Sequence, residues 1–154
     1  MSGYFEGDLI RPLGLVTLYF GYAEAQVNFL LDMLSDCGLH IEVSPVAPLG
    51  QRLAEINVAI KRLTCAGAPE VLELLEEARE LLDQRNSLVH GCVLAKGRVI
   101  PNDPGKSEFY VTSEALTTLA DRVFDWKERL DAAVQRRLVP ALRERTTMSG
   151  RGDR

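Results

Sequence analysis

The fold class is decided by the stretch from Pro69 to His90, PEVLELLEEARELLDQRNSLVH. Its apolar residues recur at spacings of three and four, which places them on one face of a helix. They are Val71, Leu74, Leu75, Ala78, Leu81 and Leu82. Pro69 suits the first turn of a helix, and the glutamates that follow it suit the positive N-terminal pole. The stretch therefore predicts one long amphipathic helix that ends near His90 and Gly91.

Two further helices are expected before this stretch. Residues 13–37 carry an apolar stripe at the helical period and a second stripe on roughly the opposite side. The first stripe is Leu13, Val16, Phe20, Ala23, Val27, Leu30, Leu31 and Leu34, and the second is Leu15, Leu18, Tyr22, Phe29 and Met33. Gly38 suits the end of this helix, and Pro45 and Pro48 indicate a loop. Residues 49–65 repeat the amphipathic pattern and predict a second helix.

The chain changes character after the long helix. Residues 92–111 contain strand-like runs on either side of a Pro-Asn-Asp-Pro-Gly turn signal. Ser113 is a reasonable N-cap for a last amphipathic helix, which should kink or end near Pro140. These elements predict an all-α, up-and-down bundle of about four helices, with a short β-hairpin or loop before the last helix.

Length and composition bound the domain organisation. A chain of 154 residues, 46% hydrophobic and 26% charged, has the size and make-up of one globular domain. We expect a single domain over residues 1–145 and a flexible C-terminal tail over residues 146–154. No apolar run approaches the roughly 20 residues of a membrane span, and the N-terminus lacks a signal-peptide pattern. We therefore expect a cytoplasmic protein that does not enter a membrane.

Cysteine usage and charge argue against other classes of protein. Cys37, Cys65 and Cys92 form no close-spaced pair, which argues against a metal knuckle or a disulfide framework. An acidic row on the long helix is interpreted as a solvated face, because the Glu-x-x-His pattern of di-iron bundles is absent. The row is Glu73, Glu76, Glu77, Glu80 and Asp83. We expect no metal and no cofactor. The net charge of -4 argues against a general nucleic-acid coat but permits an enzyme with a small basic site.

The doubled apolar face of helix 13–37 leaves surface to cover. A homodimer through a helical face would cover it. The alternative is that this helix is the central helix of a monomeric bundle.

Arg85 breaks the apolar pattern of the long helix. Its direction lies between those of Leu81 and Val89, where a leucine would be expected. A buried guanidinium must be paired, or must line a site that a ligand or partner completes. Glu24, at the border of the first stripe of helix 13–37, is a candidate partner for Arg85. The alternative is that Glu24 is an exposed edge carboxylate.

Asn86 and His90 are neighbours on one flank of the same helix, because four residues separate them. They can hydrogen-bond or share a ligand. His90 lies in the last turn, where the helix dipole favours the protonated imidazole, which suits general acid catalysis. The neutral imidazole would suit a general base. A capping histidine and a paired arginine are the structural alternative.

The hexapeptide Arg85-Asn86-Ser87-Leu88-Val89-His90 resembles the signature of the HEPN family, an arginine, a polar residue, three residues and a histidine at the end of a bundle helix. The resemblance extends over the chain in outline, but only the hexapeptide is specific. It implies a homodimer in which two such helices meet at one cleft and cut RNA without a metal. Arg85, Asn86 and His90 would then be the catalytic residues.

The resemblance also implies a division of labour among these residues. The imidazole of His90 would assist removal of the 2′-hydroxyl proton, and Arg85 would stabilise charge on the phosphate, giving a cyclic phosphate product. Some family toxins have a tyrosine two residues after the histidine that a partner enzyme modifies. Cys92 stands at that position here, so this mode of control is not expected.

Three functions remain open from the sequence. The first is a metal-independent endoribonuclease of a toxin or phage-defence system, acting as a homodimer on RNA, with an antitoxin or other protein as a possible partner. The second is a non-catalytic HEPN-like module that binds a nucleotide or a protein. The third is an unrelated helical interaction protein.

Overall fold

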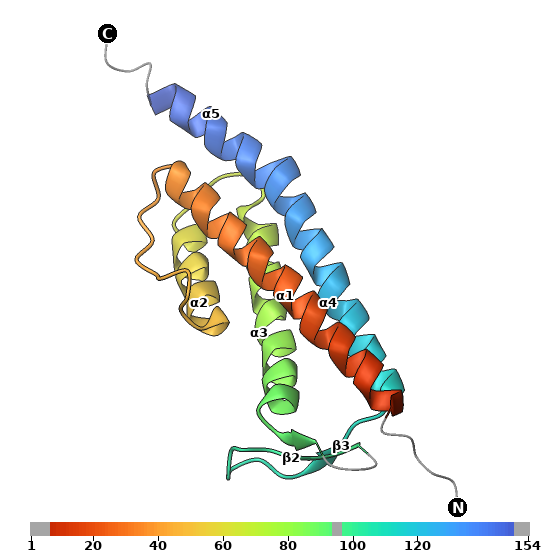
Figure 1. The fold of residues 1–154 in the computed structure, drawn as a ribbon. Coiled ribbons are helices and arrows are strands. Elements are labelled where there is room, and N and C mark those ends of the chain that lie inside the picture. Colours follow the sequence, from red (N-terminus) through yellow and green to blue (C-terminus); the bar gives the residue numbers. More distant parts are fainter. Residues whose placement is uncertain (1–6, 94–96, 150–154) are drawn as a thin grey trace, which may run out of the picture.

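A computed structural model describes residues 7–93 and 97–149 of the chain (Figure 1). The helices are α1 (Gly7–Asp36), α2 (Leu49–Lys61), α3 (Ala68–Val89), α4 (Ser113–Ala133) and α5 (Val139–Ser149), and a π-helical turn, η2 (Val134–Leu138), joins the last two. The strands are β1 (Cys92–Val93), β2 (Arg98–Ile100) and β3 (Phe109–Tyr110). The predicted all-α bundle with a small β element before the last helix is confirmed.

The directions of the helices follow from the loop between α1 and α2. Residues 37–48 turn back along α1, so that α2 begins beside the middle of α1 and runs in the same direction (Figure 1). α4 also runs parallel to α1, since the ring of Tyr19 packs 5.2 Å from that of Phe124, and Gln26 donates a hydrogen bond to Asp131 at 3.0 Å. α3 runs against all three. The helices of the bundle therefore do not alternate strictly in direction.

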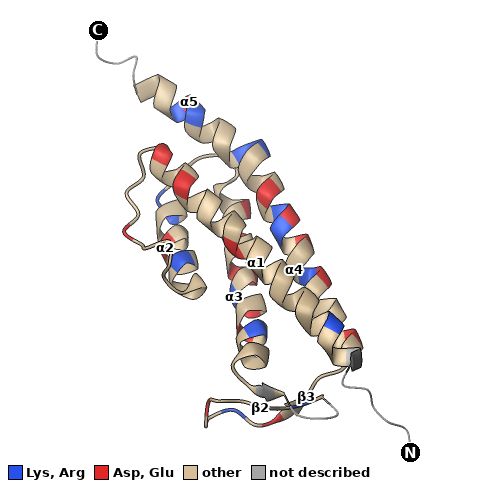
Figure 2. Ribbon diagram, in the orientation of Figure 1, with Lys and Arg blue, Asp and Glu red and all other residues tan. Residues whose placement is uncertain are grey.

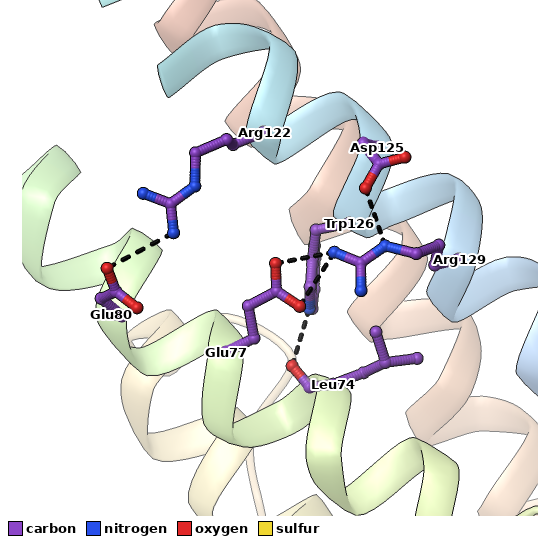
Figure 3. Close-up of polar contacts among 7 residues, drawn as sticks. All are labelled: Leu74, Glu77, Glu80, Arg122, Asp125, Trp126 and Arg129. Carbon is purple, nitrogen blue, oxygen red and sulfur yellow. Dashed lines mark hydrogen bonds and ion pairs between the residues drawn. The ribbon is translucent and has the colours of Figure 1, made fainter. Parts of the chain in front are cut away.

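One hydrophobic core lies between α1, α2, α3 and α4. Val16, Val27, Ile60 and Leu130 have no exposed surface, and Trp126 of α4 is buried against α3. The indole nitrogen of Trp126 donates a 2.7 Å hydrogen bond to the carbonyl oxygen of Leu74 (Figure 3). A buried indole N–H needs such an acceptor, so this bond fixes the register between α3 and α4.

Ion pairs follow the outer edge of the α3–α4 contact (Figure 3). Arg122 lies 3.3 Å from Glu80, and Arg129 donates to both Glu77, at 2.7 Å, and Asp125, at 2.7 Å. The hydrogen bond from Arg129 to Glu77 raises the pKa of Arg129 above its ordinary value. Two members of the acidic row on α3 therefore hold arginines of α4 rather than facing solvent alone.

The small sheet closes the lower end of the bundle in Figure 1. It has three antiparallel strands in the order β1-β2-β3, with Val93 opposite Val99 and Val99 opposite Phe109. The side chain of Val99 is fully buried. The sheet therefore packs onto the end of α3, where the predicted site residues lie.

The N-terminal boundaries of α1 and α4 differ from the predictions. α1 begins at Gly7 and not at residue 13, because a helix tolerates Pro12 near its start at the loss of one backbone hydrogen bond. The N-cap of α4 is Thr112 and not Ser113, since the hydroxyl oxygen of Thr112 accepts a 3.0 Å hydrogen bond from the amide of Ala115.

The last helix extends further along the chain than the sequence indicated. The helix continues past Pro140, because η2 widens the turn that precedes this proline, and α5 runs to Ser149. Residues 146–149, predicted as tail, are thus helical, and residues 150–154 lie outside the described residues. No helix in the described part of the chain combines the length and apolar character that crossing a bilayer requires.

Candidate functional site

The end of α3 is fixed by local sequence and by the sheet. His90 is the C-cap residue, and its backbone N–H donates to the carbonyl oxygen of Asn86 at 3.0 Å. Gly91 follows, and a Cβ placed there would lie 2.6 Å from the carbonyl oxygen of Ser87 and 2.7 Å from Cγ1 of Val99. Only glycine allows this close approach. The helix therefore ends at the predicted place, with His90 directly at the contact between helix and sheet.

Arg85 is half-buried and faces α1. Its Nη1 donates a 3.0 Å hydrogen bond to Oδ1 of Asn86, and its guanidinium carbon lies 5.9 Å from the centre of the Phe20 ring. The Nε of Arg85 is buried and has no hydrogen-bond partner within the described structure. The side chain is thus held in place by an amide and a ring, and neither of them carries a negative charge.

Asn86 and His90 do not hydrogen-bond through their side chains in the described structure. The side-chain oxygen of Asn86 accepts a hydrogen bond from Arg85, and this bond orients the guanidinium. His90, one helical turn further along, is exposed to solvent. The imidazole of His90 forms no hydrogen bond with any described residue. The structure therefore joins Arg85 and Asn86 by a hydrogen bond and leaves His90 exposed at the helix end.

Glu24 does not pair with Arg85, which corrects the candidate partner suggested by the sequence. Its Oε2 lies 3.4 Å from Nη2 of Arg52, on α2. Arg52 is only 5% exposed, and it also donates to the carbonyl oxygen of Ala47 at 2.8 Å and to Oδ1 of Asn28 at 2.6 Å. Arg52 is a buried structural arginine that sequence reasoning missed, although it lies on the apolar stripe of its helix just as Arg85 does.

Four arginines in the described part of the chain are partly or fully buried. They are Arg52, Arg85, Arg98 and Arg122. Three of them lie near a carboxylate. Arg52 and Arg122 pair with glutamates at 3.4 Å and 3.3 Å. Arg98 lies 3.7 Å from Glu108, which is too far for a hydrogen bond. Arg85 has no carboxylate within 4.0 Å among the described residues. It therefore carries a charge that the described chain does not balance nearby.

The surface near Arg85 is not covered by α2. A Cβ placed on Gly50, in the first turn of α2, would lie 3.3 Å from Leu82 of α3, so α2 begins about one turn above Arg85. Val89, one turn beyond Arg85 on the same stripe, is exposed. The last turn of α3 is thus open to solvent on the side where α2 covers the rest of the helix.

The described residues form no metal-binding cluster, but they do form a hollow beside α3. Within residues 7–93 and 97–149, no cluster of three or more His, Cys, Asp and Glu side chains is placed to hold a metal ion. A hollow of about 280 Å³ lies between α3, β3 and α4. It is lined mainly by apolar residues, with Gln84 and Ser87 as the polar ones, and it contains none of the predicted site residues.

Comparisons with known proteins do not add to this description. No family model, no curated protein and no solved structure matches the chain.

Proposed function

We propose that this protein is a metal-independent endoribonuclease in which Arg85 binds the scissile phosphate and His90 transfers a proton. The unbalanced charge of Arg85 is the observation that carries this proposal. The buried Nε lacks an acceptor, and leaving a buried donor unsatisfied costs about 1–3 kcal/mol. A phosphate oxygen of bound RNA would supply the negative charge that the guanidinium lacks.

The reaction that fits these residues is an internal transfer of the phosphodiester. The 2′-oxygen forms a bond to phosphorus as the bond from phosphorus to the 5′-oxygen breaks, which leaves a 2′,3′-cyclic phosphate and a free 5′-hydroxyl. Neutral His90 would accept the 2′-hydroxyl proton, and the leaving 5′-oxygen would take a proton from water. Arg85 would stabilise the charge that develops on the phosphate, with Asn86 holding its guanidinium in place.

The test compares two site variants with two matched controls on a labelled single-stranded RNA in the presence of EDTA. Arg85→Leu and His90→Ala should lower the cleavage rate by about 100-fold or more. Arg79→Leu is the matched arginine control, because Arg79 is an exposed residue of α3 that contacts only Glu76 at 3.6 Å. His40→Ala is the matched histidine control, because His40 is exposed and pairs with Glu42. Both controls should cut at the wild-type rate.

Two outcomes would count against the ribonuclease. Equal cleavage by all four variants would assign the activity to a contaminant. Cleavage that stops in EDTA and returns with magnesium would mean that the mechanism uses a metal.

The second candidate function is a non-catalytic module that binds a nucleotide or RNA. It is favoured by one observation, the absence of any hydrogen bond from described residues to the imidazole of His90, since catalytic histidines are usually oriented by a partner. In that case wild type would bind RNA without cutting it. Arg85→Leu would lose binding, while His90→Ala would keep it. A toxin or phage-defence role and a shared cleft between two motif helices stay predictions of the resemblance.

A further inference from the structure

The outer face of α1 is apolar although it faces solvent. Leu18 is 47% exposed, and Tyr22 and Phe29 on the same face are exposed to a similar extent. Between Arg11 and Asp32 the only charged residue is Glu24, whose carboxylate turns sideways toward Arg52. Figure 2 shows α1 without charge over most of its length and with acidic bands at its upper, C-terminal end. Leu18, Tyr22 and Phe29 of the predicted second stripe are therefore exposed within one chain, whereas Met33 is buried in the core and Leu15 is partly buried.

Small residues alternate with the large ones on this face. Gly14, Gly21 and Ala25 are exposed, and a Cβ placed on Gly14 or Gly21 would meet no described atom within 4 Å. Glycine inside a helix costs about 1 kcal/mol relative to alanine. Nothing in the chain itself requires these glycines, so a close approach from outside the chain explains them best.

We propose that a second copy of this chain packs its α1 antiparallel against this face, about a two-fold axis near Gly21 and Tyr22. Charge sets the direction, because Arg11 lies at one end of the face and Asp32 at the other. An antiparallel pair places Arg11 level with Asp32 of the partner subunit, whereas a parallel pair would place like charges together.

Side-chain size sets the register of the pair. The same axis places Gly14 level with Phe29 of the partner subunit and Leu18 level with Ala25 of the partner subunit. Each level then combines one large and one small side chain, which lets two helices pack closely.

The face continues onto α4, which widens the interface beyond a single helix. The ring of Tyr19 lies 6.3 Å from that of Tyr22 and 5.2 Å from that of Phe124, and Phe124 is itself exposed. Arg85 contacts α1 through Phe20, which points into the core on the opposite side of the helix. The paired α1 helices therefore leave the Arg85 side of the bundle open, and this inference does not depend on the ribonuclease proposal.

Sedimentation velocity over a concentration series tests the interface. Wild type should be a dimer at micromolar concentration, and Leu18→Glu should raise the dissociation constant by about tenfold or more, because each new carboxylate would be buried against the partner without a counter-charge. Val58→Glu is the matched control, since Val58 on α2 is 46% exposed and lies away from this face. A monomeric wild type, or a Leu18→Glu dimer as tight as wild type, would overturn the proposal.

Cross-linking tests the direction of the pair with single cysteine variants. Tyr22→Cys should form a disulfide-linked dimer on mild oxidation, beyond any background from the native cysteines of wild type. Arg11→Cys should cross-link with Asp32→Cys when the two are mixed, but not with itself. Self-linked Arg11→Cys, or no cross-link in the Tyr22→Cys and mixed samples, would overturn the antiparallel arrangement.

Discussion

Arg52 and Arg85 lie on the inner faces of two different helices, and both reach toward α1, but their surroundings differ. Arg52 gives its donors to Ala47, Asn28 and Glu24 and is nearly fully buried. Arg85 has one hydrogen bond, to its neighbour Asn86, and one ring contact. An arginine on an apolar stripe is thus not in itself a sign of a functional site.

The difference between the two arginines follows from how far α2 extends along the bundle. The loop before α2 returns along α1 and brings Ala47 and the start of α2 to the level of Glu24 and Asn28, where Arg52 finds its partners. α2 does not extend to the last turn of α3, and no described helix or loop offers Arg85 an acceptor beyond its neighbour Asn86. Arg52 is therefore structural because α2 and the loop before it bring it to its partners, whereas Arg85 is a candidate functional residue because these segments do not reach it.

Replacing Arg52 should give the largest loss of stability. Arg52→Leu leaves the carboxylate of Glu24 and the oxygens of Asn28 and Ala47 without their donor. The free energy of unfolding, measured in urea, should therefore fall by about 3 kcal/mol, which is the lower end of the range for breaking a buried ion pair. The lower end applies because the side chain of Glu24 is 39% exposed. Gln51→Leu, at the exposed neighbouring position, is the control and should change stability by less than about 0.5 kcal/mol. An Arg52→Leu protein as stable as wild type would mean that Arg52 is not structural.

The coupling energy between Glu24 and each arginine should be smaller than the loss caused by Arg52→Leu, and it should differ between Arg52 and Arg85. A double-mutant cycle of Glu24→Gln with Arg52→Leu should give a coupling energy of about 0.5–1 kcal/mol, since the pair is 3.4 Å apart and partly exposed. The cycle of Glu24→Gln with Arg85→Leu should give a coupling within about 0.3 kcal/mol of zero. Equal coupling to both arginines would contradict the assignment of Glu24 to Arg52.

The sequence predicted the positions of the helices with strong hydrophobic periodicity. It did not predict contacts between segments that are far apart in the chain. The stripe of α3 and the glycine after His90 predicted where the motif helix ends, and the second stripe of α1 includes the residues that are exposed, Leu18, Tyr22 and Phe29. The partner of Glu24 could not be predicted, because it depends on the path of the loop before α2. The sequence left open whether the last helix kinks or ends near Pro140, because a π-helical turn has no simple periodic signal.

The smallest expected change in stability comes from Arg85→Leu. The substitution removes the hydrogen bond to Asn86 and the contact with the Phe20 ring, which together contribute roughly 1–2 kcal/mol. It also removes the unsatisfied buried Nε and places an apolar side chain on the stripe of α3, which offsets that loss. No described carboxylate is stranded, so the free energy of unfolding should stay within about 0.5 kcal/mol of wild type, measured in the same urea titration. A loss comparable to that of Arg52→Leu would reveal a structural partner of Arg85, and the ribonuclease proposal would lose the observation that carries it.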